Sequence, residues 1–311
     1  MDTNSIYNSQ GNKLYKNLLL FTKSNTEAVA KGDKLHLSEI YEIADHIIKD
    51  FKRSPDLMDS AVNFYEPDDV FISHVVNNTI FSLKMALDMN LSEEDIQDTV
   101  AAALLHDTGF GKLDEYLRDK EQDENLITEK DIELMRTHSK HGFEAIAPEN
   151  ERDKRIAEII LHHHEKADSS GYPNGLKESQ QQPLARIISI VDAYEALIHP
   201  RTFRDALVPP DGLGVIINKK GTEFSHKMIK ILINSLSFFP VGQTVLLNNG
   251  FIGKVIRTYK DNPLRPDVQL HFDPSGNRLE NPRIIQLRGK TILFIDKCLP
   301  GFKSKTSGFK K

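Results

Sequence analysis

The 311-residue chain has one cysteine, no tryptophan and no long uninterrupted apolar run. The single thiol, Cys298, excludes an internal disulfide and a metal site built from thiolates, and it fits a reducing compartment. No stretch approaches the roughly 18 apolar residues of a membrane span. The polar N-terminus lacks a signal-peptide pattern. These absences lead us to expect a cytoplasmic protein without a membrane segment.

The chain also lacks an excess of positive charge. It has 40 Lys and Arg against 45 Asp and Glu, a formal net charge of -5. This balance argues against a surface for long nucleic acid, because such affinity comes from many cations that release counterions. A small phosphorylated ligand needs only a local basic pocket, so that class of ligand stays open.

Helical periodicity dominates the chain up to about residue 240, which predicts a mainly α fold. Apolar residues recur on one helical face from Leu35 to Phe51. Later helices begin at Ser, Thr or Pro start signals. We expect these helices over residues 67–90, 92–106, 128–146, 151–164 and 183–198.

The pattern changes after Pro240, where short β-rich runs follow one another. Asn249-Gly250 is a strong hairpin signal, and "DVQLHF", "RIIQL" and "TILFID" have the composition of strands. We therefore expect a small antiparallel β appendage. The predicted parts are an N-terminal helical region (1–67), a main helical domain (68–240), the β subdomain (241–300) and a tail (301–311).

The stretch "HHHEKADSSGYPNGL", residues 162–176, gathers three imidazoles, two carboxylates and a Gly-Tyr-Pro turn. At about 100° per residue, His163 and His164 continue the apolar stripe of the preceding helix, whereas His162 falls off it. Similar donors lie in or beside apolar helical stripes elsewhere. They are His74, His106, Asp107, His138 and Asp192.

Each of these donors alone is more often an ordinary core or surface residue. Together they place imidazoles or carboxylates on five helices, and buried groups at this density are costly unless they are paired or bound to metal. Mixed imidazole and carboxylate ligands suit Fe, Mn or Zn. Seven donors are too many for one ion, and a carboxylate such as Asp107 can bridge two. We predict a paired-metal site of the kind used for phosphoester displacement.

These residues carry a resemblance to the HD-GYP family, a branch of the HD-domain metal-dependent phosphohydrolases. The resemblance covers about residues 70–240. The family has an all-helical core, so the resemblance implies an HD-domain helical bundle as the catalytic domain, residues 68–240. The family's usual activity is hydrolysis of cyclic di-GMP to pGpG or GMP. The matching segments are "SHVVNN", "LLHDTG", "RTHSKHG", "HHEKADSSGYPNGL" and "IISIVDAYEALIHPRTFR".

The resemblance also implies roles for single residues. His106 and Asp107 would form the catalytic centre, where a hydroxide activated by two divalent ions, Fe or Mn, attacks the phosphorus. Tyr172, Arg201 and Arg204 match positions that hold the phosphates and guanines of the ligand. His162 has no counterpart. The implied metal ligands are His74, His106, Asp107, His138, His163, His164 and Asp192.

The chain departs from the family pattern at three positions. The usual Lys three residues after the Asp of the His-Asp doublet is Phe110, and we take Lys112 as its substitute. Val70 stands where members with three metals carry an acidic residue, which favours two ions. Ser169 replaces a Gly and would resist a positive φ, so we expect a slightly different turn.

Three functions remain open at this point. The first is a cyclic di-GMP phosphodiesterase. Phe110 and the lack of a recognisable fused sensor or output domain leave a second, a non-catalytic effector that binds the dinucleotide. The third is an HD phosphohydrolase that acts on another cyclic dinucleotide, such as cyclic GMP-AMP. A homodimer or a signalling partner protein is compatible with each of them.

Overall fold

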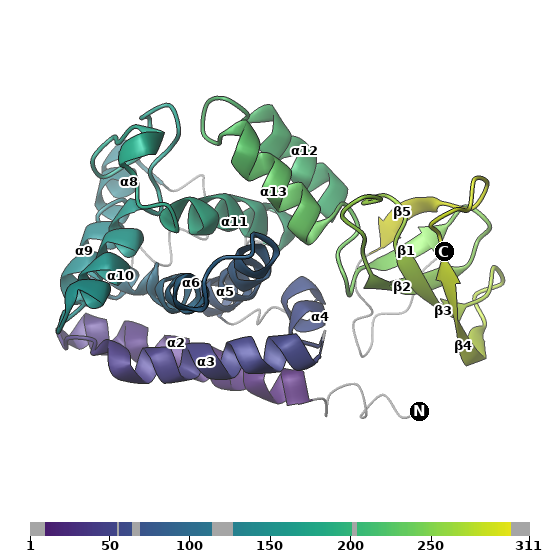
Figure 1. Ribbon diagram of the computed structural model, residues 1–311, viewed down its shortest axis with the longest axis horizontal. Coiled ribbons are helices and arrows are strands. Elements are labelled where there is room, and N and C mark those ends of the chain that lie inside the picture. Colours follow the sequence, from purple (N-terminus) through teal and green to yellow (C-terminus); the bar gives the residue numbers. More distant parts are fainter. Residues whose placement is uncertain (1–9, 55, 64–68, 114–126, 201–203, 300–311) are drawn as a thin grey trace.

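The computed structural model describes residues 10–54, 56–63, 69–113, 127–200 and 204–299. A helical bundle and a small β-sheet lie side by side, and the chain passes from one to the other after α13 (Figure 1). The predicted fold class, mainly α with a small C-terminal antiparallel sheet, is confirmed.

Within the described residues, the bundle is formed by α-helices and two short 3-10 turns. In chain order they are α2 (Gln10–Lys31), α3 (Leu37–Arg53), α4 (Asp56–Asn63), α5 (Val70–Asp88), α6 (Glu93–Leu105), the 3-10 turn η1 (Thr108–Lys112), α8 (Glu129–Met135), α9 (His138–Ala145), α10 (Glu151–His162), the 3-10 turn η3 (Glu178–Gln180), α11 (Ala185–Ile198), α12 (Pro209–Asn218) and α13 (His226–Leu236).

The centre of the bundle is α5, which packs against α6 and α11. Its N-terminus is capped by Asp69, whose side chain accepts a hydrogen bond from the backbone N–H of Ile72 at 3.3 Å. Helix α5 is long and apolar enough to cross a membrane, but 78% of its apolar 18-residue stretch is buried in the bundle. Our expectation that no segment approaches such a composition is therefore too strict. The burial marks α5 as a core helix.

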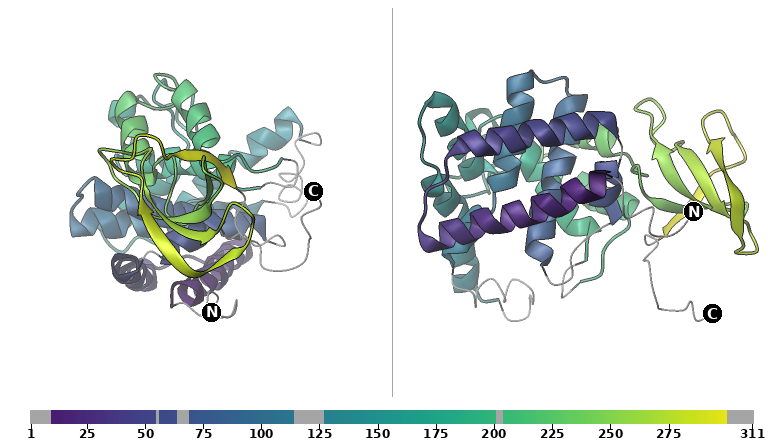
Figure 2. Two further views of the ribbon diagram at one scale, coloured as in Figure 1. Left: turned by 90° about the vertical axis from the view of Figure 1, so that its right-hand side faces the viewer. Right: turned by 90° about the horizontal axis from the view of Figure 1, so that it is seen from below.

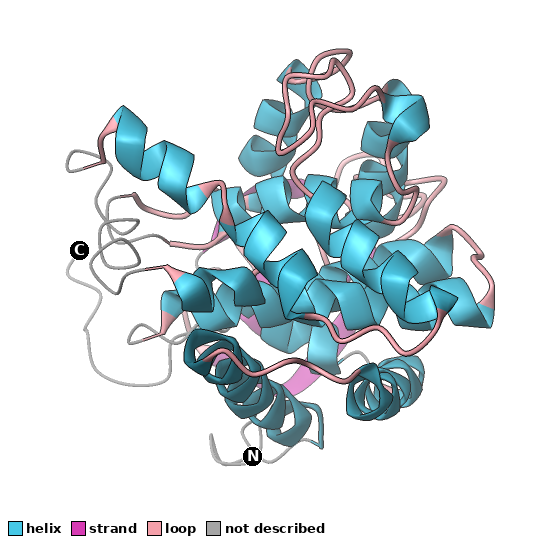
Figure 3. Ribbon diagram, turned by 90° about the vertical axis from the view of Figure 1, so that its left-hand side faces the viewer, coloured by secondary structure: helices cyan, strands magenta, loops and turns pink. Residues whose placement is uncertain are grey.

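The N-terminal helices α2 and α3 cover one side of the bundle. Figure 2 shows them next to each other on the outer face, and Figure 3 shows them end-on beneath the other helices. Each has an apolar stripe that turns inward, through Tyr15 and Leu18 on α2 and through Ile40 and Ile47 on α3. These side chains belong to one continuous core that extends to Leu236.

The predicted helix over residues 128–146 is wrong in one respect, because the structure divides it into α8 and α9. The capping box of Thr128 and Asp131 begins α8 as expected. The Thr137 hydroxyl then donates to the carbonyl oxygen of Leu134 at 2.6 Å, and this side chain competes with the helical backbone pattern. The break places His138 at the first position of α9.

The C-terminal sheet has the strand order β4-β3-β2-β1-β5, and all its pairings are antiparallel. Gly250 takes a positive φ of 86° in the predicted hairpin turn. The predicted strand "TILFID" begins too early. Residues 291–294 precede the observed strand, and Phe294 is hydrogen-bonded to Asn248. The strands are β1 (Thr244–Leu247), β2 (Ile252–Arg257), β3 (Asp267–Phe272), β4 (Arg278–Gln286) and β5 (Ile295–Leu299).

Candidate metal centre

All seven predicted ligand positions meet inside the bundle. His74 lies on α5, and Asp192 lies on α11. The others lie where helices begin or end: after α6, at the start of α9 and after α10. Five of the seven are buried, and His164 and Asp192 are partly exposed. His162 lies outside the group, where its Nδ1 accepts the backbone N–H of Gln182 at 3.3 Å.

Three of the histidines are oriented by a carbonyl oxygen of the helix that precedes each of them. His106, His138 and His163 each place Nδ1 at 2.7, 2.7 and 2.6 Å from the carbonyl oxygen three residues earlier. A carbonyl oxygen only accepts, so the proton of each ring is on Nδ1. Each Nε2 therefore presents a lone pair to the centre, the tautomer that a metal requires.

Asp107 lies between two groups of donors. Its Oδ1 is 3.3 Å from Nε2 of His138 and 3.5 Å from Nε2 of His163. Its Oδ2 is 3.4 Å from Nε2 of His106 and 3.9 Å from Nε2 of His74. We call His74, His106 and Asp107 the first ligand group, and Asp107, His138, His163 and His164 the second. The shared carboxylate turns one oxygen toward each group.

Asp192 spans the same two groups. Its Oδ1 lies 2.8 Å from Nε2 of His74 and 3.9 Å from Nε2 of His106, in the first group. Its Oδ2 lies 3.8 Å from Nδ1 of His164, in the second. Two carboxylates thus extend between two sets of imidazoles, an arrangement suited to a pair of cations.

The polar atoms of this centre fit a cation better than one another. Nε2 of His106 and Oδ1 of Asp107 are buried and have no hydrogen-bond partner among the described residues. The Nε2 atoms of His138 and His163 lie 3.2 Å apart, although both rings carry their proton on Nδ1. Two lone pairs that face each other without a proton are satisfied by a positive ion.

The protonation states also suit metal binding. Burial lowers the pKa of His106 from 6.5 to about 4. Burial likewise holds the pKa of His164 well below its usual value. For Asp107 burial alone would raise the pKa, but the neighbouring imidazoles outweigh it and the pKa lies well below the ordinary value. At neutral pH His106 and His164 are therefore neutral and Asp107 is ionised, which are the forms that bind metal.

Glu195 supports the first ligand group, and the sequence reasoning did not single it out. Its Oε2 contacts Nδ1 of His74, and its Oε1 lies 2.8 Å from Nδ1 of His199. His74 is thereby oriented by a carboxylate rather than by a carbonyl oxygen. The available signal was spacing, because Glu195 follows Asp192 by three residues on an apolar helix and so lies on the same face.

An open cleft of about 260 Å³ lies over the centre. Five of the seven ligand positions line it, all except His106 and His163. We call the seven ligand positions the floor and the lining residues that are not ligand positions the rim. The rim is mostly apolar, and Arg136 is its one cation among the described residues. The rim residues are Phe71, Phe110, Ile132, Met135, Arg136, Tyr172 and Ala196.

Tyr172 is placed by the Gly-Tyr-Pro loop after α10. A side chain at Gly171 would collide with backbone atoms of residues 164–166 at 2.4–2.5 Å, so glycine is required there. The Tyr172 ring stacks on His164 with 4.7 Å between ring centroids. Ser169 has a φ of 67°, so our expectation that serine would avoid this conformation is wrong.

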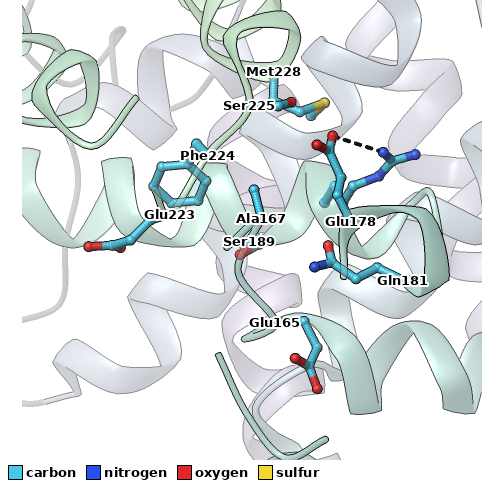
Figure 4. A pocket seen from close by; sticks show the side chains of 10 residues that line it. Glu165, Ala167, Glu178, Gln181, Ser189, Glu223, Phe224, Ser225 and Met228 are labelled. Atoms are coloured by element: carbon cyan, nitrogen blue, oxygen red, sulfur yellow. Dashed lines mark hydrogen bonds and ion pairs between the residues drawn. The ribbon is translucent and has the colours of Figure 1, made fainter. Parts of the chain in front are cut away.

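The loop is held from behind by Glu165, a buried carboxylate. It accepts the backbone N–H groups of Asn174 and Leu176 at 2.7 and 2.8 Å. Figure 4 shows Glu165 and Gln181 beside a cavity of about 10 Å³, near the ion pair of Glu178. That volume admits about one water molecule, so the cavity gives room for no larger ligand.

Arg136 is a rim residue that the sequence reasoning missed. Its guanidinium carbon lies 5.2 Å from the centroid of the Tyr172 ring. Nearby, the Phe110 ring stacks on His138 with 4.2 Å between ring centroids. The residue that replaces the usual Lys therefore covers one of the predicted metal-ligand histidines. The sequence signal for Arg136 is that it lies two residues before His138. This spacing indicates a position near the metal centre only once the break between α8 and α9 is known.

Two of the three cations that we predicted for substrate binding, Lys112 and Arg204, do not line the cleft. Lys112 does not line the cleft: it is two residues from Phe110 on the tight turn η1, and its ammonium lies beside Gly32 after α2. Arg204 donates to the backbone carbonyl oxygens of Leu197, Asp205 and Ala196, which keeps its guanidinium at the end of α11. Arg201 lies outside the described residues.

The helical fold and its buried cage of imidazoles and carboxylates define a class of protein with a site that could hold metal ions. Comparison with known proteins identifies the family. The HD domain matches residues 67–227, and a KOW domain associated with the HD domain matches residues 244–304. The chain belongs to the HD domain family, and the kinship predicted from its motifs is confirmed.

Relatives with curated names are similar at modest identity. "Cyclic di-GMP phosphodiesterase PA4108" of Pseudomonas aeruginosa is 24% identical over 241 residues, which are 78% of this chain and 57% of the relative. "Cyclic di-GMP phosphodiesterase PdeB" of Borreliella burgdorferi is 25% identical over 197 residues, 63% of this chain and 51% of the relative. The chain thus spans about half the length of these relatives.

One solved structure shares the fold. Bd1817, described as an HDG"Y"P protein from Bdellovibrio bacteriovorus, superposes with a TM-score of 0.56 and covers 74% of both chains at 18% identity. At this identity the likeness concerns the fold alone. It supports the arrangement of helices that brings the seven ligand positions together.

Proposed function

We propose that the protein is a metal-dependent phosphodiesterase that hydrolyses cyclic di-GMP to pGpG or GMP. The observation that carries this proposal is the position of Asp107, whose two oxygens face two separate groups of donors beneath an open cleft. The names of the two curated relatives support the choice of substrate.

The first and second ligand groups would hold two divalent ions, Fe or Mn, with Asp107 shared between them. When bound, such ions supply Lewis acidity for water and neutralise charge on the phosphate oxygens. The protein's own contribution is to hold the donors in fixed tautomers and to bury them, which strengthens electrostatic interactions at the reacting phosphate.

The rim would bind the rest of the substrate. The Tyr172 ring offers a face for stacking on a guanine, and the forked donors of Arg136 suit a phosphate or a guanine edge. The cleft, at about 260 Å³, lies just below the common range of about 300–1,000 Å³ for small-molecule sites. We infer that it holds one phosphodiester and its flanking groups, while the rest of the dinucleotide lies over the exposed rim.

One observation favours a second candidate, a non-catalytic effector that binds the same dinucleotide. Among the described residues the rim offers one cation, Arg136, and Phe110 occupies the position of the usual Lys. Fewer cations at the phosphate would weaken transition-state stabilisation more than ground-state stacking.

The test is a metal analysis of anaerobically purified protein, paired with hydrolysis assays of the Fe- and Mn-loaded forms. The substrates are cyclic di-GMP, 3'3'-cyclic GMP-AMP and linear pGpG. We expect two ions per chain and cleavage of cyclic di-GMP that chelation abolishes. Tight binding without cleavage would establish the effector. Cleavage of cyclic GMP-AMP alone would correct the substrate.

A further inference from the structure

We propose that Tyr15 on α2 is a positioning residue for His74 and acts on it through Asn77 and Glu195. The proposal rests on the proposed function only in that His74 is a metal ligand. Tyr15 precedes the part of the chain that matches the HD domain, which begins at residue 67. A helix outside the family domain would thereby take part in holding the metal centre.

A continuous set of buried hydrogen bonds connects the two residues. The Tyr15 hydroxyl donates to Oδ1 of Asn77 at 2.6 Å. Nδ2 of Asn77 donates to Oε1 of Glu195 at 3.0 Å, and Oε2 of Glu195 contacts Nδ1 of His74. Tyr15, Asn77, Glu195 and His74 are 2%, 0%, 1% and 5% exposed, so water does not compete with these bonds.

The direction of each bond gives Tyr15 its effect. An amide has one accepting and one donating end, so a phenol that donates to Oδ1 of Asn77 turns Nδ2 toward Glu195. Without the phenol, a flipped amide would set its oxygen against the Glu195 carboxylate. The Glu195 carboxylate accepts the Nδ1 proton of His74 and fixes the ring so that Nε2 faces Asp107 and Asp192.

The effect should be partial, because Glu195 has a second partner. Nδ1 of His199 lies 2.8 Å from the same Oε1 atom that Asn77 contacts. Loss of a direct outer partner of a metal ligand typically costs about 10–100-fold in metal affinity. Tyr15 acts through two intervening groups, so we expect a smaller loss, about 3–10-fold.

The experiment compares Tyr15→Phe with Tyr41→Phe in the full chain. Tyr41, on α3, donates to Oδ1 of Asp153 at 3.0 Å, so each variant removes one phenolic hydrogen bond from an N-terminal helix. Of these two tyrosines, only Tyr15 is connected to the metal centre by the hydrogen bonds described above. The readouts are the Mn²⁺ dissociation constant without substrate and the tautomer of His74 from its ring ¹⁵N shifts in the metal-free protein.

We expect Tyr15→Phe to weaken Mn²⁺ binding about 3–10-fold and to reduce the Nδ1-protonated fraction of His74. Tyr41→Phe should leave both within about twofold, although both variants lose some thermal stability. If Tyr15→Phe matches Tyr41→Phe in both readouts, the role of Tyr15 is structural and the proposal is overturned. Normal Mn²⁺ binding by a wild type that cleaves no dinucleotide would defeat the proposed function and leave this test intact. A wild type that binds no Mn²⁺ would defeat both.

Discussion

The floor and the rim of the cleft differ in how their side chains are held. The floor positions are mostly buried, and three of their imidazoles are oriented by carbonyl oxygens of the preceding helices. The rim comes from α5, η1, α8, α11 and the Gly-Tyr-Pro loop, and Ile132 and Arg136 are exposed. The side chains of the floor are therefore fixed in place, whereas those of the rim are accessible to a bound molecule.

The position of the floor residues explains their rigidity. His106 and His163 directly follow α6 and α10, and His138 follows α8 after the break at residue 137. The last carbonyl groups of a helix have no partner within the helix. These histidines supply the missing donor, so one contact both caps the helix and fixes the tautomer of a metal ligand.

Substitution of the shared floor carboxylate should have the largest effect. Asp107→Asn keeps the shape of the side chain but removes the charge that faces both ligand groups. We expect loss of bound metal, measured by elemental analysis, and a fall in kcat of at least about 1,000-fold, about 4 kcal/mol.

The matched control is Asp168→Asn, at an exposed carboxylate of the loop after α10, which should stay within about twofold of wild type. Its Oδ1 accepts from Ser170, and an amide oxygen can do the same. If Asp107→Asn retained two ions per chain, the floor would not depend on a bridging carboxylate.

Acid should destabilise the floor next most strongly. The folded pKa of His106, about 4, lies below its value of 6.5 in an unfolded chain, so folding favours the neutral ring. This stability is complete above pH 6.5 and is lost as the pH falls through about 4. The difference corresponds to roughly 3 kcal/mol.

The lowered pKa values of Asp107 and Asp192 act in the same direction at still lower pH. Urea unfolding of the metal-free protein should therefore show a midpoint that decreases between pH 7 and 4.5. A midpoint that rises on acidification would contradict the neutral state of the buried imidazoles.

The sequence predicted the floor because its residues obey helical periodicity. His163 and His164 follow a stripe of isoleucines on α10, and a period of 3.6 residues is enough to place them inward. Periodicity cannot show that five helices converge. That step came from the cost of burying so many polar donors without a metal, and the family resemblance then supported it. Glu195 was missed because nothing in the spacing distinguishes a support for His74 from an ordinary buried carboxylate.

The rim was poorly predicted because it depends on turns. Phe110 lines the cleft and Lys112 does not, although the two are only two positions apart on η1. The packing of that turn alone decides which side chain faces the cleft. Arg204 satisfies nearby carbonyl oxygens instead of a ligand. Arg136 reaches Tyr172 because α8 ends early, and no capping signal in the sequence announces that end.

A change at the rim should affect binding rather than chemistry. Arg136→Ala removes the rim cation, and a hydrogen bond to a charged group is worth about 1.5–3 kcal/mol. We expect KM for cyclic di-GMP to rise by about 10-fold while kcat stays within about threefold. Lys140→Ala, at an exposed position of the adjacent α9, is the matched control. A fall in kcat with unchanged KM would instead assign Arg136 to stabilisation of the transition state.

The smallest effect is expected at Lys112, and it tests where the rim ends. Its ammonium lies beside Gly32, away from the cleft, so Lys112→Ala should change KM and kcat by less than about twofold. The family pattern would assign a lysine near this point to a phosphate of the substrate. If Lys112→Ala raised KM as much as Arg136→Ala, η1 would have to change its orientation when the substrate binds. The rim would then be a surface that forms around its ligand, in contrast to a floor that is already in place.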